Sequence, residues 1–198
     1  MNVSPHYLQV LVQHFSSIGK VDDAAFNKLV SCIRQDEYAK GEKLIAHGQY
    51  AKHLHFIGRG AVIGYITDAD GKDYIKSVFF EGDFPSSQVS LLENSPSYLS
   101  LETIEDSTII SIDYKLFREL MKEFKSLNDF YISYLEKSWI IGRERREVSL
   151  VMESADKRYL DFITRFPEKE KRLKQKHLAA HLGITPTQLS RIKKKLNR

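Results

Sequence analysis

Side chains that could bind a polyanion gather near the C-terminal end of this 198-residue sequence. Residues 169–198 contain ten Lys or Arg side chains and a single acid, Glu170. The other 168 residues are net acidic, with 20 basic and 25 acidic side chains. A compact basic block on an otherwise acidic chain is typical of a module that binds nucleic acid. A solvated basic tail is the alternative that composition alone leaves open.

Within this block, a predicted helix over 186–196 separates an apolar face from a polar one. Leu189, Ile192 and Leu196 form its buried stripe. On the opposite face, Arg191 could reach the O6/N7 edge of guanine and Gln188 the N6/N7 edge of adenine, each giving roughly 1–3 kcal/mol of discrimination. The other polar side chains would mainly hold phosphates. The predicted DNA-binding residues are Lys176, Thr185, Thr187, Gln188, Ser190, Arg191, Lys193, Lys194 and Lys195.

A tight turn is predicted just ahead of that helix. Leu178 and Leu182 give the preceding segment an apolar helical face, and Gly183 stands where a helix end favours a left-handed residue. Thr185 is a suitable N-cap, and Pro186 fits the first helical position. The pattern predicts a helix, a glycine turn and a second helix, which is the geometry of a DNA-binding helix-turn-helix. A basic hairpin that serves only solubility is the alternative.

A long helix is predicted over 126–153, followed by a helix over 155–166 that ends at Pro167 and by a charged linker over 168–174. Side chains spaced alternately by fours and threes form a heptad-like seam on the long helix, although one arginine and one serine weaken it. Such a seam is typical of a coiled coil between two copies of a chain. A helix packed on its own domain is the alternative. The predicted dimer interface consists of Leu127, Tyr131, Tyr134, Ser138, Ile141 and Val148.

The first part of the chain has a different pattern. Helical spacing over 5–33 is replaced at about Asp36 by short β-rich runs between turn signals, which continue to about Asp113. Many short strands of this kind indicate an antiparallel roll or barrel. We therefore predict an α+β fold with three parts: a sensor-like β-roll domain over 1–125, a dimerisation helix over 126–153, and an all-α DNA-binding domain over 154–198.

Several classes of function are excluded by what the sequence lacks. With Cys32 as the one cysteine, an internal disulfide, an iron–sulfur cluster or a cysteine-ligated zinc site cannot form, which favours a cytoplasmic location. The sequence has no apolar run long enough for a membrane span and no signal-peptide pattern at its start. His177 and His181 have metal-ligand spacing but no third ligand, so we predict no metal site and a surface pair beside DNA phosphates. Enzyme motifs are absent, and an enzyme is not expected.

Four stretches carry a resemblance to a known family: Lys40–Ile45, Leu54–Val62, Glu81–Phe84 and Ile104–Ser107. Together with the order of the predicted elements, they resemble the Crp/Fnr family of bacterial transcription regulators over essentially the whole chain. The resemblance implies a β-roll (a double-stranded β-helix) of the cyclic-nucleotide-binding type and a homodimer joined through the long helix. It also implies binding to a pseudo-palindromic operator with half-sites about 34 Å apart. Regulation would follow from contact with RNA polymerase or from occlusion.

The sequence departs from this family at the effector pocket. In members that bind cyclic AMP, a Gly-Glu pair soon follows Gly-Asp-Phe, and an Arg that takes the phosphate comes about a dozen residues later. Here Ser86 and Ser87 replace the pair, and Tyr98 stands near the Arg position. The resemblance therefore predicts that cyclic AMP and cyclic GMP do not bind, and that the pocket is empty, collapsed or adapted to a less charged ligand. The pocket residues implied are Phe84, Ser86, Ser87, Tyr98, Leu99 and Tyr134.

A second departure concerns the β-hairpin wing that usually follows the recognition helix in this family. The sequence shows no obvious wing, so Lys193 to Arg198 would have to supply its phosphate contacts. A rival hypothesis is a β-roll interaction module whose basic end binds a protein or membrane surface. An amphipathic membrane helix would need a wider apolar face than the predicted helix over 186–196 provides, so we expect no membrane partner.

Overall fold

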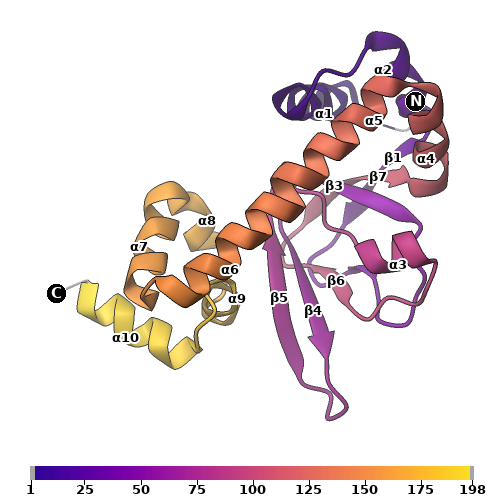
Figure 1. The fold of residues 1–198 in the computed structure, drawn as a ribbon. Coiled ribbons are helices and arrows are strands. Elements are labelled where there is room, and N and C mark those ends of the chain that lie inside the picture. The colour runs from indigo at the N-terminus through magenta and orange to yellow at the C-terminus, as the bar shows by residue number, and fades with distance from the viewer. Residues whose placement is uncertain (1–2, 197–198) are drawn as a thin grey trace.

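The computed structural model describes residues 3–196, and it contains two facing antiparallel sheets (Figure 1). One sheet has the strand order β1-β7-β3, and the other has the order β2-β6-β4-β5. The predicted antiparallel β-roll is therefore confirmed. The strands are β1 (Ile33–Tyr38), β2 (Lys43–Ile45), β3 (His53–Arg59), β4 (Val62–Thr67), β5 (Asp73–Phe79), β6 (Ser100–Thr103) and β7 (Ser107–Asp113).

Helices that precede the roll in the sequence and helices that follow it pack together on the roll, in one shared core. Phe15 of the first helix and Phe130 of the fifth stack with ring centroids 3.9 Å apart, and Leu11 and Leu127 are fully buried beside them. Asp22 caps the second helix by accepting a hydrogen bond from the Ala25 backbone N–H at 2.8 Å. The helices are α1 (Pro5–Ile18), α2 (Asp23–Val30), α3 (Gln88–Glu93), α4 (Tyr114–Glu123) and α5 (Lys125–Tyr134).

The predicted long helix is present, but it has an irregular centre. It consists of α5, a π-helical segment η1 (Leu135–Ile141) and α6 (Gly142–Met152). In the π-helical segment the Gly142 N–H donates to the Lys137 carbonyl, five residues back. Because a π-turn contains more residues than an α-turn, the helix faces before and after η1 are rotated relative to one another. Figure 1 shows the helix running from α1 and α2 to the C-terminal helices.

Residues 155–196 form a separate helical cluster, called here the C-terminal unit. Its core contains Tyr159, Phe162, Leu178 and Leu189. The linker predicted over 168–174 is instead largely helical, because a proline fits the first turn of a helix as well as it ends one. Arg198, a predicted phosphate contact, lies outside the described residues. The helices are α7 (Ala155–Arg165), α8 (Pro167–Arg172), α9 (Gln175–His181) and α10 (Pro186–Leu196).

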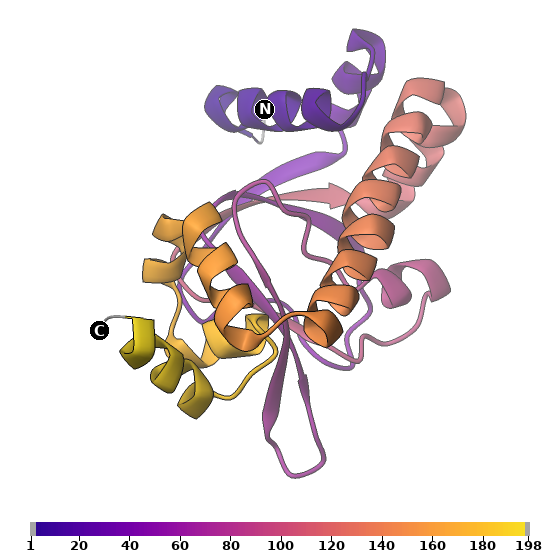
Figure 2. The same ribbon diagram turned by 60° about the vertical axis from the view of Figure 1, so that its left-hand side comes forward.

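The C-terminal unit lies against the roll, with α9 beside β5 (Figure 2). Arg172 joins the two parts because its guanidinium forms ion pairs with Glu81, at 2.7 Å, and with Glu105. Leu173 packs against the apolar clusters of both parts. Within residues 3–196, no helix is both long enough and apolar enough to cross a membrane.

Candidate functional site

The turn between α9 and α10 is built as the sequence predicts. Gly183 has a φ of +66°, the left-handed conformation that glycine adopts at low cost. Thr185 Oγ1 accepts a hydrogen bond from the Gln188 N–H at 3.1 Å, and Gln188 Oε1 accepts one from the Thr185 N–H at 2.9 Å. This reciprocal cap fixes the start of α10. It also engages the Gln188 side chain, which would have to leave the cap to reach a base edge.

The polar face of α10 combines free cations with paired ones. Arg191 and Lys194 are exposed, and neither forms an ion pair with another residue in the range 3–196. Lys193 pairs with Glu170, and Lys195 pairs with Asp156 at 2.5 Å. Of the smaller predicted contacts, Thr187 is exposed and Ser190 is half-buried, while Lys176 lines a cleft of about 410 Å³ between α9 and the β4–β5 hairpin.

The prediction that His177 and His181 form a surface pair is wrong. His177 is only 3% exposed, and the His181 ring packs on Phe162 with ring centroids 5.1 Å apart. Burial, together with neighbouring Lys or Arg side chains, lowers the pKa of each imidazole to about 4. Both histidines are therefore neutral packing groups near pH 7. Among the described residues, no cluster of three or more His, Cys, Asp or Glu side chains is placed to hold a metal ion.

A cavity of about 460 Å³ lies between the roll and the long helix, and we call it the roll–helix cavity. Four of the predicted pocket residues line it: Phe84, Ser86, Leu99 and Tyr134. The other two do not. Ser87 is buried and accepts a hydrogen bond from Ser97 Oγ at 2.8 Å, whereas Tyr98 is 41% exposed, with Lys76 Nζ 5.6 Å from its ring centroid.

None of the charged residues in this cavity was among the pocket residues predicted from the sequence. Asp83 accepts a hydrogen bond from the Phe80 N–H at 2.8 Å, and burial raises the pKa of its carboxyl group. Arg143 and Glu147 form an i,i+4 ion pair at 3.4 Å, and Arg146 is half-buried beside them. These side chains lie off the heptad-like seam, so the seam did not indicate them. Their spacing of three and four residues was a usable signal for a second face.

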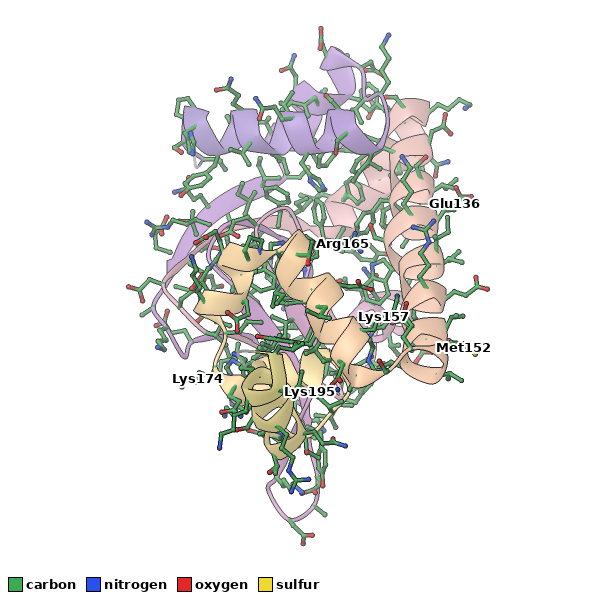
Figure 3. The ribbon with its side chains drawn as sticks, turned by 90° about the vertical axis from the view of Figure 1, so that its left-hand side faces the viewer. Glu136, Met152, Lys157, Arg165, Lys174 and Lys195 are labelled. Atoms are coloured by element: carbon green, nitrogen blue, oxygen red, sulfur yellow. The ribbon has the colours of Figure 1, made fainter. Side chains whose placement is uncertain are left out.

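The predicted dimer residues divide into two groups. Leu127, Tyr131 and Tyr134 are buried in the core of their own protomer, so their assignment to a dimer interface is wrong. Ser138 lines the roll–helix cavity, although it is itself exposed. The remaining two, Ile141 and Val148, are exposed. Met152 continues their face, and Figure 3 shows it on the outer side of the helix at its lower end.

Comparisons with known proteins agree with this architecture. Residues 35–124 match the family model of the cyclic nucleotide-binding domain. No curated protein sequence matches the chain. Among solved structures, FixK2 from Bradyrhizobium japonicum has a TM-score of 0.68 at 18% identity, with 83% of this chain and 84% of that chain covered.

Two further solved structures have the same arrangement. The c-di-GMP responsive global regulator CLP from Xanthomonas campestris gives a TM-score of 0.65 at 17% identity, with coverage of 89% and 92%. The catabolite activator protein of Thermus thermophilus gives 0.53 at 16% identity, with coverage of 89% and 84%. Residues 35–124 therefore have the β-roll fold of the cyclic nucleotide-binding domain, and the chain as a whole has the Crp/Fnr fold.

Proposed function

We propose that this protein is a sequence-specific, DNA-binding transcription regulator of the cytoplasm. The observation that carries the proposal is α10, whose start is fixed by a capped, glycine-led turn and whose polar face carries Arg191 and Lys194 without internal ion pairs among the described residues. A helix with this chemistry fits the major groove, with its N-terminal part at the base edges and its lysines at phosphates.

The regulator acts as a homodimer in this proposal. The outer face of α6, with Val148 54% exposed and Met152 78% exposed, is an apolar strip that a second copy of the chain would cover. Two recognition helices related by a two-fold axis would read a pseudo-palindromic operator. Contact with RNA polymerase or occlusion of its site would then change transcription.

The effector of this regulator is not cyclic AMP in our proposal. Ser87, which stands where the family carries an acceptor carboxylate, is buried and hydrogen-bonded to Ser97, so it is turned away from the cavity. Tyr98 offers an exposed phenol near the position of the phosphate-binding arginine. A cyclic phosphate would therefore lack the partners that it has in members that bind cyclic AMP.

The proposal is tested by selecting random duplex DNA with the purified protein, with and without cyclic AMP. We expect the same pseudo-palindrome in both arms. Enrichment only with cyclic AMP would show that the pocket assignment is wrong. Absence of any enriched sequence would favour the rival hypothesis, in which the basic C-terminal unit binds a protein surface.

Two variants separate base contacts from phosphate contacts on the selected site. Arg191→Ala should lose about 1–3 kcal/mol on the selected sequence and little on random DNA. Lys194→Ala should weaken binding to both and reduce the slope of log K against log salt by up to about one unit. Equal losses of Arg191→Ala on the two DNAs would contradict its role as a base contact.

A further inference from the structure

Arg146 on α6 is a half-buried guanidinium in the wall of the roll–helix cavity. It forms no ion pair and donates no hydrogen bond to any residue in the range 3–196. Arginine is rarely buried without a partner, because removing a cation from water costs free energy that an anion or several acceptors normally offset. Burial and the nearby Arg158 lower the pKa of Arg146, as expected for a cation whose lost hydration no anion offsets.

The other charged groups of the cavity leave this positive charge unbalanced. Glu147 is occupied by Arg143 at 3.4 Å, and Asp83 already accepts a hydrogen bond from the Phe80 backbone. Burial raises the pKa of the Asp83 carboxyl group. Lys76 adds a second cation at the same cavity. The charged residues that line the cavity therefore favour binding of an anion.

The rest of the wall is suited to an apolar body. Phe84, Leu99, Leu101 and Trp139 line the cavity, and its volume of about 460 Å³ is in the range of small-molecule sites. His14 also lines it, and the buried Nε2 atom of that imidazole has no hydrogen-bond partner among the described residues. A bound molecule would thus meet apolar surface together with the cations of Arg146 and Lys76.

We propose that the roll–helix cavity binds a small organic monoanion with an apolar body, such as an aromatic carboxylate, whose charge pairs with Arg146. This inference rests on the proposed function only for the regulatory meaning of the ligand. It revises the sequence-based expectation of a less charged ligand, because the cation that matters comes from the long helix and not from the roll.

The same helix connects the cavity to the turn before α10. Leu150 lines the cavity, and its side chain lies so close to Gly183 that a Cβ atom at that glycine would collide with it. Arg146 also lies near His181 of α9, and it contributes to the lowered pKa of that imidazole. A ligand in the cavity would therefore contact Leu150, whose side chain packs against the turn that positions the recognition helix.

The test compares two fluorescent probes on the full chain: anilinonaphthalene sulfonate and its uncharged counterpart, N-phenylnaphthylamine. We expect the sulfonate to bind the native protein more tightly. Arg146→Gln should weaken sulfonate binding by about tenfold or more, and it should change binding of the uncharged probe by less than about twofold. Retained binding of the uncharged probe shows that the cavity of the variant is intact.

Arg145→Gln is the matched control, because Arg145 is the residue next to Arg146 on the same helix, is turned about 100° away from it, and does not line the cavity. It should leave both dissociation constants unchanged. Equal binding of the two probes to the native protein, or an equal effect of the two arginine variants, would overturn the proposal. Displacement of the sulfonate by micromolar cyclic AMP would also overturn it. These readouts require no DNA, so their failure is distinct from failure of the DNA selection.

Discussion

The two halves of the long helix differ in environment although they continue one heptad-like pattern. In α5, Leu127, Tyr131 and Tyr134 are all buried in the core shared with the roll. In α6, none of the described residues 142–152 is buried, and Val148 and Met152 are largely exposed. Heptad spacing therefore identifies an apolar face, but it does not identify the surface that covers that face.

The irregular segment between the halves explains part of the difference. The π-helical segment η1 changes which face of the helix is turned to the roll. Before η1, the stacked rings of Phe15 and Phe130 hold α5 against α1. Within η1, Lys137 Nζ donates a hydrogen bond to the Ile18 carbonyl at 2.8 Å. Beyond it, α6 leaves the roll and reaches the C-terminal unit. The first half thus belongs to the core, whereas the second half leaves an apolar strip exposed.

The largest expected effect is on the stability of the buried half. Leu127→Ala should lower the free energy of unfolding by about 2–5 kcal/mol, because a fully buried leucine leaves a cavity in the core. Val148→Ala should change it by less than about 0.5 kcal/mol under conditions where the protein is monomeric. Urea denaturation followed by circular dichroism measures both. Similar losses for the two variants would show that α5 and α6 do not differ in burial.

The next effect is on association through the exposed half. Val148→Glu combined with Met152→Glu should weaken self-association by about a hundredfold, because two charges would be buried at the proposed contact. Analytical ultracentrifugation over a concentration series measures this change. The double variant should unfold at the same urea concentration as the native protein when both are monomeric. An unchanged dimer would place the contact elsewhere on the molecule.

A pH dependence should report on the contact between α6 and the C-terminal unit. The pKa of His181 is about 4 in the folded protein, below the usual value of about 6.5, so the unfolded chain binds a proton first. Stability is therefore full above about pH 6.5 and falls as the pH approaches 4, with a total loss of about 3 kcal/mol. His181→Gln should make the pH profile shallower. His177, with its pKa also at about 4, and the buried His55, with its pKa at about 3, add slope in the same direction.

The positive charge of Arg146 on α6 is one cause of the lowered pKa of His181. Arg146→Gln removes a cation near His181, so it should raise the pKa of that imidazole in an NMR titration. An unchanged value would mean that burial and Lys169, without Arg146, set the pKa of His181. The control is Arg145→Gln, which should not shift the titration.

The smallest effect concerns the attachment of the C-terminal unit to the roll. Arg172→Gln should reduce the protection of α9 amides against hydrogen exchange by about 0.5–1 kcal/mol, because the ion pairs of Arg172 with Glu81 and Glu105 are partly exposed to solvent. Lys171→Gln is the control, because Lys171 pairs only with the neighbouring Glu168 on an exposed surface. Equal protection in both variants would show that apolar packing of Leu173 alone holds the unit in place.

Local features of the chain were predictable from the sequence because they depend on neighbouring residues. Gly183 and Thr185 specify the turn and the cap of α10 within a few positions of each other. Alternation of apolar and polar residues indicated the strands of the roll. Pro167 was misread, since the same residue type that ends one helix also begins α8. Of the predicted cavity residues, Phe84 and Tyr134 lie as expected, whereas Tyr98 does not.

By itself, the sequence determined the order of roll, long helix and capped helix pair, because periodicity and turn residues act over short distances. Only the tertiary structure decided which half of the long helix is buried and that Arg146 faces a cavity. It also paired Lys193 with Glu170 and Lys195 with Asp156, across 23 and 39 residues of chain. An ion pair or a buried face depends on which surfaces meet in space. Residue spacing states which side chains share a face, but it does not state what that face contacts.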